Sequence, residues 1–128
     1  MNRQRMLLVE DHEETRTLLR RMLSLCGWKV AEAATVAEGL DRLDPPPDCL
    51  VLDLGLPDGN GETILRTVRE AHLPTRVVIT TAGCDSERMR EVSDLKPDAI
   101  LQKPLDSKGL RTICAGMRAE EGTGMRLA

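Results

Sequence analysis

Five chemically versatile side chains stand at or just beyond the carboxyl ends of short apolar runs in this 128-residue chain: Glu10, Asp11, Asp53, Thr81 and Lys103. Three carboxylates held close together repel one another, and each gains proton affinity unless a cation lies among them. Such an oxygen-rich set suits Mg²⁺ or Mn²⁺, which can leave room for a phosphate ligand. A lysine and a hydroxyl nearby can bind phosphoryl oxygens. The set therefore predicts phosphoryl chemistry, with Asp53 as the nucleophile that forms an aspartyl phosphate.

Five apolar runs predict the strands that bring these side chains together. Four are short and continuous, which is typical of strands buried on both faces of a parallel sheet. They span residues 6–9, 49–52, 77–79 and 99–101. The run at 28–33 is interrupted by Lys29 and Glu32, so it predicts a half-exposed edge strand. Ligands of open parallel sheets bind beyond the carboxyl ends of the strands, and we expect one pocket there.

Apolar stripes with helical spacing separate these runs. The second stripe opens with a capping box of Thr35 and Glu38, and Asp85 or Ser86 is the predicted N-cap of the fourth. The five stripes are Leu18, Leu19, Met22, Leu25 and Cys26; Val36, Leu40 and Leu43; Ile64, Leu65, Val68 and Ala71; Met89, Val92 and Leu95; and Leu110, Ile113, Cys114 and Met117. This alternation predicts an α/β fold with a doubly wound, five-stranded parallel sheet and helices on both faces.

One domain accounts for the periodic part of the chain. We expect it to span residues 1–118, with a flexible C-terminal tail at 119–128 that lacks periodicity. Asp58 and Asn60, before the third helix, are predicted turn residues. The net charge of −3 gives no basic excess that would indicate direct binding of nucleic acid. No apolar stretch reaches the length that crosses a membrane.

The four cysteines, Cys26, Cys49, Cys84 and Cys114, include no CxxC pair, so their spacing indicates neither a zinc site nor a thioredoxin-like site. All but Cys84 fall in apolar runs or stripes and are interpreted as small core residues. Cys84 follows Thr81 closely and is interpreted as an inert thiol. No signal-peptide pattern is visible, so we expect a cytoplasmic protein with reduced thiols.

Four motifs, in order and each at the end of a predicted strand, make the sequence resemble the receiver domains of two-component response regulators, including the chemotaxis regulator. The motifs are Leu7-Leu8-Val9-Glu10-Asp11, Asp53-Leu54-Gly55-Leu56-Pro57 with Gly61 four residues later, Thr81-Ala82, and Lys103-Pro104. The resemblance extends from about residue 5 to residue 118. Each motif alone is common, but the ordered set is specific.

The resemblance implies a flavodoxin-like strand order of 2-1-3-4-5 and a cis peptide between Lys103 and Pro104. The phosphoryl donor would be a phosphohistidine on a histidine kinase or a histidine phosphotransfer protein. The domain would act as a phosphorelay switch of protein–protein interactions with slow autodephosphorylation, not as a metabolic enzyme, and the sequence does not name its downstream effector. The metal ligands implied are Glu10, Asp11, Asp53 and the backbone carbonyl of Gly55.

Several positions bear on how phosphorylation would be reported and lost. The family usually carries an aromatic residue three positions before the lysine, where this chain has Ile100, so reporting by an inward-turning ring is not expected. We expect the signal to pass instead through Thr81, Ala82 and the fourth helix. Gly55 and Gly83 are minimal residues near the phosphoacceptor, so water should reach the aspartyl phosphate and shorten its lifetime.

Three other functions are compatible with parts of the sequence, and each meets a residue or segment that argues against it. A phosphohydrolase of similar layout needs a second Asp two residues after the nucleophile, where this chain has Gly55. A nucleotide- or flavin-binding domain needs a phosphate loop after the first strand, where an acidic segment at 10–14 stands instead. A degenerate receiver used as an unphosphorylated scaffold is the main alternative, because Ile100 replaces the aromatic residue, although the complete acidic, Thr and Lys set argues against it.

Overall fold

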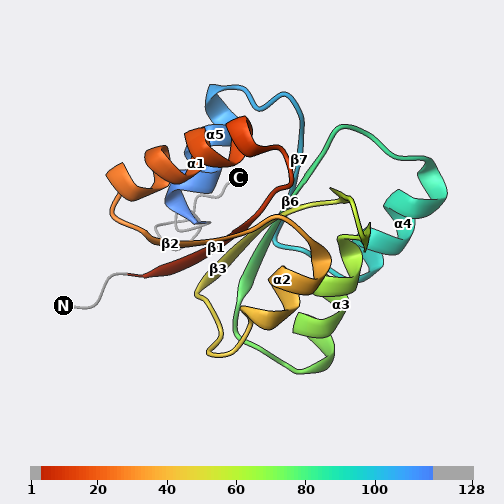
Figure 1. The fold of residues 1–128 in the computed structure, drawn as a ribbon. Coiled ribbons are helices and arrows are strands. Elements are labelled where there is room, and N and C mark those ends of the chain that lie inside the picture. The colour runs from red at the N-terminus through yellow and green to blue at the C-terminus, as the bar shows by residue number, and fades with distance from the viewer. Residues whose placement is uncertain (1–3, 117–128) are drawn as a thin grey trace, which may run out of the picture.

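Five parallel strands form the central sheet of the computed structural model, which describes residues 4–116 (Figure 1). The predicted tail at 119–128 lies outside the described residues. The sheet order is β2-β1-β3-β6-β7, which confirms the predicted order 2-1-3-4-5, since a short hairpin takes the labels β4 and β5. The strands are β1 (Arg5–Val9), β2 (Lys29–Ala33), β3 (Cys49–Asp53), β4 (Gly55–Leu56), β5 (Gly59–Asn60), β6 (Arg76–Thr81) and β7 (Ala99–Gln102).

Helices cover both faces of this sheet, as the alternating sequence pattern predicts. Figure 1 shows α1 and α5 on one face and α2, α3 and α4 on the other. The helices are α1 (Glu13–Leu25), α2 (Val36–Asp41), α3 (Glu62–Glu70), α4 (Ser86–Asp94) and α5 (Ser107–Ala115). Among residues 4–116, no helix combines the length and the apolar character that spanning a membrane requires.

The inner strands are buried on both faces, which explains their continuous apolar sequences. In β1, Met6 and Leu8 belong to the hydrophobic cluster under α1 and α5, while Leu7 and Val9 belong to the cluster under the other helices. Successive strand residues point to opposite faces, so each of the inner strands β1, β3 and β6 contributes to both clusters. β2 alternates between exposed and partly buried residues up to its buried last residue, as expected of an edge strand.

The prediction that the run at 99–101 is buried on both faces is wrong. β7 is the other edge strand and alternates between partly buried and exposed residues, with Ile100 and Gln102 exposed.

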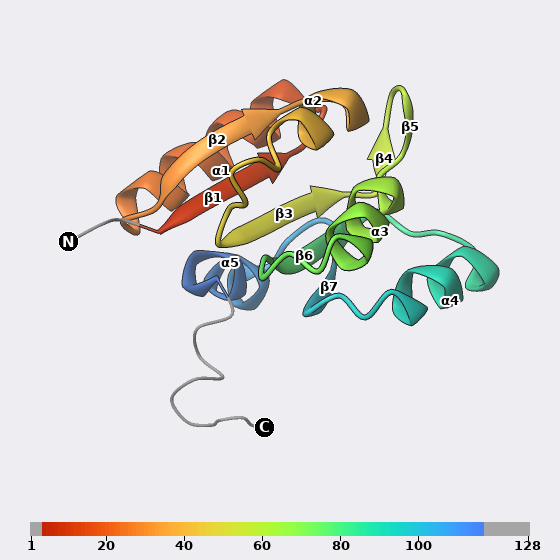
Figure 2. The same ribbon diagram turned by 90° about the horizontal axis from the view of Figure 1, so that it is seen from below.

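The strand register brings the carboxyl ends of the strands to one end of the sheet. Asp53 pairs with Thr80, and Thr81 pairs with Gln102. Figure 2 shows β1, β2 and β3 running in the same direction, toward the end where the β4–β5 hairpin projects. The polar residues at the strand ends therefore share one end of the sheet.

Side-chain caps begin four of the helices. Thr35 Oγ1 accepts a hydrogen bond from the Glu38 N–H at 3.0 Å, which confirms Thr35 as the cap of α2. The Glu38 half of the predicted capping box is shifted by one residue, because Glu38 Oε1 accepts from the Ala34 N–H at 2.7 Å and not from the N–H of Thr35. Asp85, not Ser86, caps α4. His12 caps α1 and Asp106 caps α5 in the same way.

The apolar stripe predicted for α1 is partly wrong. Leu18 is 66% exposed and Leu25 is 89% exposed, while the helix buries Leu19 and Leu23. Leu19 and Leu23 are one helical turn apart and face the sheet, so the neighbouring Leu18 is rotated toward solvent. In a helix with so many leucines, the sequence alone does not determine which face is buried; the packing of the helix against the sheet does.

The prediction of reduced thiols is also wrong for Cys26 and Cys114, and so is the core position predicted for Cys26, whereas Cys114 does pack against the core. Cys26, at the C-terminus of α1, forms a disulfide with Cys114 in α5, with a Cα–Cα distance of 6.2 Å. Cys26 is exposed and Cys114 is half-buried. Cys49 is buried, as predicted, and Cys84 is a half-buried free thiol. Because α1 and α5 pack on the same face of the sheet, the fold brings together cysteines that lie 88 residues apart.

Reduction of this disulfide should lower the free energy of unfolding by about 3 to 5 kcal/mol, because it releases a long covalent loop in the unfolded chain. Urea denaturation with and without dithiothreitol measures the effect. The Cys26→Ser/Cys114→Ser double variant is the control and should not respond to the reductant. A wild-type midpoint that dithiothreitol leaves unchanged would show that the thiols are not paired in solution.

Candidate functional site

Three carboxylates meet at the carboxyl end of the sheet. Glu10 and Asp11 follow β1, Asp53 ends β3, and one carboxylate oxygen of each residue lies within 4.8 Å of the others. Glu10 and Asp53 are buried, at 2% and 5% exposure, whereas Asp11 is exposed. The strand order thus brings together the three carboxylates that sequence analysis singles out.

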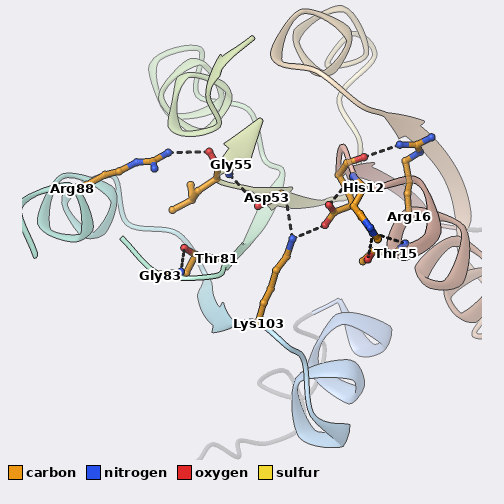
Figure 3. Close-up of polar contacts among 11 residues, drawn as sticks. His12, Thr15, Arg16, Asp53, Gly55, Thr81, Gly83, Arg88 and Lys103 are labelled. Atoms are coloured by element: carbon orange, nitrogen blue, oxygen red, sulfur yellow. Dashed lines mark hydrogen bonds and ion pairs between the residues drawn. The ribbon is translucent and has the colours of Figure 1, made fainter. Parts of the chain in front are cut away.

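Lys103 bridges the two buried carboxylates, and Figure 3 shows its side chain extending toward Asp53. Its Nζ lies 2.8 Å from Oε1 of Glu10 and 3.1 Å from Oδ2 of Asp53. Its backbone N–H donates to the Thr81 carbonyl at 2.8 Å, which fixes the start of the side chain beside β6. The peptide between Lys103 and Pro104 is cis, as the family resemblance implies.

Burial and hydrogen bonding act in opposite directions on these charged groups. Burial raises the pKa of Glu10, and hydrogen bonds from Lys103 and from the His12 backbone offset only part of that rise. Burial alone would lower the pKa of Lys103, but its hydrogen bonds to Glu10 and Asp53 and the negative charges of these carboxylates together outweigh burial and raise that pKa. Lys103 is therefore an ammonium group at neutral pH and neutralises part of the carboxylate charge.

Backbone groups hold the other oxygens of the buried carboxylates. The Gly55 N–H donates to Oδ1 of Asp53 at 3.0 Å, and the His12 N–H donates to Oε2 of Glu10 at 3.0 Å. Arg16 Nη1 donates to the backbone carbonyl of Glu10 at 2.9 Å and secures the end of β1. Each buried carboxylate thus accepts one bond from Lys103 and one from a backbone amide, so its orientation is fixed.

The residues predicted to report phosphorylation lie at the β6–α4 loop, and Ile100, which stands at the position where the family usually has an aromatic residue, lies in β7. Thr81 is buried, and its Oγ1 accepts a hydrogen bond from the Gly83 N–H at 3.0 Å. Ala82 and Gly83 are exposed, and Gly83 has a φ of +132°, which a residue with a side chain rarely adopts. Ile100 is 37% exposed, so its side chain faces solvent at the edge strand.

Asp58 makes a contact beyond the predicted turn. Its carboxylate accepts hydrogen bonds from the backbone N–H groups of Val36 at 2.7 Å and Ala37 at 3.1 Å, at the N-terminus of α2. The bond from Val36 is the main cause that holds the pKa of Asp58 below its ordinary value. The hairpin that follows β3 is therefore attached to α2. No local sequence pattern indicates this contact.

Sequence reasoning also missed Arg88 and Glu62, which border the same loop. Arg88, in α4, forms a two-point ion pair with Glu62, the first residue of α3, at 2.7 and 2.8 Å. Nη2 of Arg88 also donates to the Leu54 carbonyl at 2.9 Å. The two charged residues lie 26 positions apart, and an acidic residue that opens a helix needs no partner to explain it. Only the folded chain reveals the pair.

The donor set of the site fits a hard divalent cation. Carboxylate oxygens are the protein ligands that Mg²⁺ prefers, and Mg²⁺ takes few of them because it keeps several waters. The two buried carboxylates are anchored by hydrogen bonds, and the exposed Asp11 leaves one side open to solvent. The acidic cluster can therefore receive both a cation and an incoming phosphoryl group.

Comparison with known proteins agrees with this geometry. The model of the response regulator receiver domain matches residues 6–115, which include all five strand-end residues. The chain belongs to the response regulator receiver family. It is a signalling domain of two-component systems, and in this family the strand-end Asp is the residue that phosphorylation modifies.

Curated relatives of this receiver domain include two transcriptional regulatory proteins of Escherichia coli strain K12. CpxR is 32% identical over 106 residues, which cover 83% of this chain and 45% of CpxR. The KDP operon regulator KdpE is 35% identical over 99 residues, which cover 77% of this chain and 44% of KdpE. The chain therefore spans less than half the length of these two relatives.

Solved receiver domains have the same fold. The non-phosphorylated HemR receiver domain from Leptospira biflexa is 25% identical, with a TM-score of 0.79, and the match covers 98% of this chain and 99% of that one. A CheY-like receiver domain protein from Methanospirillum hungatei JF-1 has a TM-score of 0.84 at 23% identity, covering 96% and 100% of the two chains. The second likeness bears on the fold alone.

Gly61 lets the chain pass close to the end of β3. A Cβ at this position would collide with the backbone carbonyl oxygen of Asp53 and would lie 3.1 Å from Cα of Leu54. Its φ of −59° is open to any residue, so the constraint is the close approach of two backbone segments.

Gly61→Ala should therefore lower the free energy of unfolding by about 1 to 3 kcal/mol, because the loop must move away from the strand. Gly55→Ala is the matched control in the same loop, since a Cβ there meets only Oδ1 of Asp53, at 3.9 Å. Urea denaturation of both variants measures the difference. Equal losses of stability would contradict the packing argument.

Proposed function

We propose that this receiver domain accepts a phosphoryl group on Asp53 from a phosphohistidine of a histidine kinase or histidine phosphotransfer protein. The aspartyl phosphate then changes which proteins the domain binds. The observation that carries the proposal is the environment of Asp53, a buried carboxylate at the end of an inner strand whose Oδ2 lies 3.1 Å from Nζ of Lys103. A purely structural carboxylate at this depth would not need two further acidic groups beside it.

The proposed reaction is a displacement at phosphorus. A carboxylate oxygen of Asp53 attacks the phosphorus atom, the new O–P bond forms, and the P–N bond to the imidazole of the donor histidine breaks, with its electron pair returning to the nitrogen. Lys103, held between Glu10 and Asp53, contributes a positive charge to a phosphoryl oxygen. Thr81 can donate its hydroxyl proton to another oxygen, in a bond additional to the one that it accepts from Gly83.

We assign the metal site to Glu10, Asp11, Asp53 and the backbone carbonyl of Gly55, with Mg²⁺ or Mn²⁺ as the ion. A bound divalent ion supplies charge neutralisation for the carboxylates and the transferred phosphoryl group. Support comes from the carboxylate cluster, in which each residue offers an oxygen within 4.8 Å of the others. Slow hydrolysis of the aspartyl phosphate would return the switch to its starting state.

We propose that the β6–α4 loop transmits the phosphorylated state of the site to α4. Thr81, Ala82 and Gly83 connect the phosphoacceptor end of the sheet to α4, and the exposed Ile100 has no ring to turn inward. Movement of the Thr81 hydroxyl toward the phosphoryl group would pull on this loop and shift α4. Pro104, after Lys103, fixes the chain direction on the other side of the site.

The output of the domain is protein–protein interaction. Residues 1–118 are proposed as the receiver and 119–128 as a flexible tail, in a cytoplasmic protein without direct contact with membrane. The relatives named above are transcriptional regulators more than twice as long as their matched part, but the −3 charge of this chain does not favour contact with nucleic acid through its own surface. Its effector is therefore another protein segment or domain.

Phosphoramidate with Mg²⁺ should add one phosphoryl group to the wild-type chain and none to Asp53→Ala, because Asp53 is the acceptor. Intact-mass spectrometry measures the gain. Removal of the metal by EDTA should suppress this gain in mass, since the carboxylates then repel the negatively charged donor. No gain in the wild type would favour the unphosphorylated scaffold.

An apolar groove of about 670 Å³ opens beside the site and is the proposed docking position of the donor protein. It lies between α1 and the chain after β7, and it reaches Glu10 and Lys103. Leu18 lines it and is 66% exposed. A partner must bring its phosphohistidine to Asp53, so apolar surface next to the site can position a helix that carries that histidine.

Leu18→Lys should slow phosphoryl transfer from a phosphorylated histidine phosphotransfer protein by at least about tenfold, because it places a charge where apolar contact is expected. Labelling by phosphoramidate should not change, since that donor needs no docking surface. Leu25→Lys is the matched control, because Leu25 is 89% exposed on the same helix and does not line the groove. Equal slowing by both variants, measured by transfer of radiolabel, would rule out this docking position.

A further inference from the structure

The peptide unit between Leu54 and Gly55 connects Arg88 to the phosphoacceptor. Its N–H, on Gly55, donates to Oδ1 of Asp53 at 3.0 Å, and its carbonyl, on Leu54, accepts from Nη2 of Arg88 at 2.9 Å. Figure 3 shows Arg88 extending from α4 toward this peptide. In a planar trans peptide the N–H and the C=O point in opposite directions, so a group that fixes the carbonyl also aims the amide.

Glu62 holds the guanidinium of Arg88 in the position that this contact requires. The two-point ion pair uses Nε and Nη2 of Arg88, at 2.7 and 2.8 Å, and Glu62 is only 5% exposed. Burial opposes ionisation of Glu62 most strongly, but the hydrogen bond and charge of Arg88, together with a backbone hydrogen bond and the charge of Arg66, outweigh burial and hold the pKa of Glu62 below its ordinary value. The pair is therefore charged at neutral pH, and its planar geometry is directional.

The same hydrogen bond has an electronic effect on the peptide. A cation that donates to a carbonyl polarises the amide, and the N–H becomes a better donor to a carboxylate. The Leu54 carbonyl also accepts from the Gly61 N–H at 3.2 Å, so it is held from two sides. Arg88 thus contributes both orientation and polarisation to the amide that contacts Asp53.

We propose that Arg88 is a positioning residue for phosphorylation, which acts on Asp53 through the Leu54–Gly55 peptide and couples α4 to the phosphoacceptor. The proposal rests on the function proposed for Asp53. Because Arg88 lies in the first turn of α4, a shift of this helix alters the hydrogen bond on Asp53, and a change at Asp53 acts back on the helix. The coupling needs no aromatic ring at Ile100.

Arg88→Met tests the proposal, because methionine keeps an unbranched apolar side chain and removes the donor. The pseudo-first-order rate constant of phosphoramidate labelling should fall about tenfold, since the carboxylate loses its fixed orientation. The amide proton resonance of Gly55 should move upfield, because its hydrogen bond to Asp53 weakens. Arg90→Met is the matched control: Arg90 is exposed on the same helix, and this variant should keep the wild-type rate and resonance.

Loss of Arg88 alone leaves the buried Glu62 carboxylate without its partner, which can destabilise the fold. The Glu62→Gln/Arg88→Met double variant removes that charge and separates stability from positioning. Urea denaturation should show its stability near that of the wild type, while its labelling rate and Gly55 resonance should remain those of Arg88→Met.

The outcomes separate this inference from the function on which it rests. A wild-type chain that phosphoramidate does not label would overturn the assignment of Asp53 as the phosphoacceptor. A labelled wild type together with a folded double variant that reacts within about twofold of it would overturn only the role of Arg88. A folded variant with a lower labelling rate but an unchanged Gly55 amide resonance would also overturn the role of Arg88, because the effect on the rate would not pass through the Leu54–Gly55 peptide.

Discussion

The contact of one ammonium group with two buried carboxylates is the interaction on which the site depends. Glu10 and Asp53 are charged groups at the end of inner strands, where the loss of hydration is costly unless each charge has a partner. Lys103 supplies that partner for both at once, within 3.1 Å. It comes from beyond β7, two strands away from β3, so only the complete sheet order can place it. The strand order that defines the fold is therefore also what assembles the site.

The loop after β3 is attached on two sides by residues that have no direct part in the proposed reaction. Asp58 attaches it to the N-terminus of α2, and Arg88 attaches it to the start of α4. Reactive groups held by packed secondary structure keep a narrower range of geometries than groups on free loops. The loop after β3 can therefore be short and rich in glycine and still hold Asp53 in one orientation.

The fold and the strand-end residues could be predicted because their signals are local in the sequence. Buried parallel strands give continuous apolar runs, and the meeting of Asp53 and Lys103 follows from their places at the ends of those runs. The ion pair between Arg88 and Glu62 and the disulfide between Cys26 and Cys114 span 26 and 88 residues, without a periodic pattern to mark them. The exposure of Leu18 depends on how α1 rotates against the sheet. Tertiary packing, not local preference, decides these features.

The disulfide divides the chain into a covalent ring and the segments outside it. Asp53, Thr81 and Lys103 lie inside the ring closed by Cys26 and Cys114, whereas Glu10 and Asp11 lie on the N-terminal segment outside it. A mechanical pull on the ends of the chain is transmitted through the disulfide and does not stretch the ring. Under load, β1 would leave the sheet and carry away two of the three carboxylates, while Asp53, Thr81 and Lys103 would stay within one closed loop.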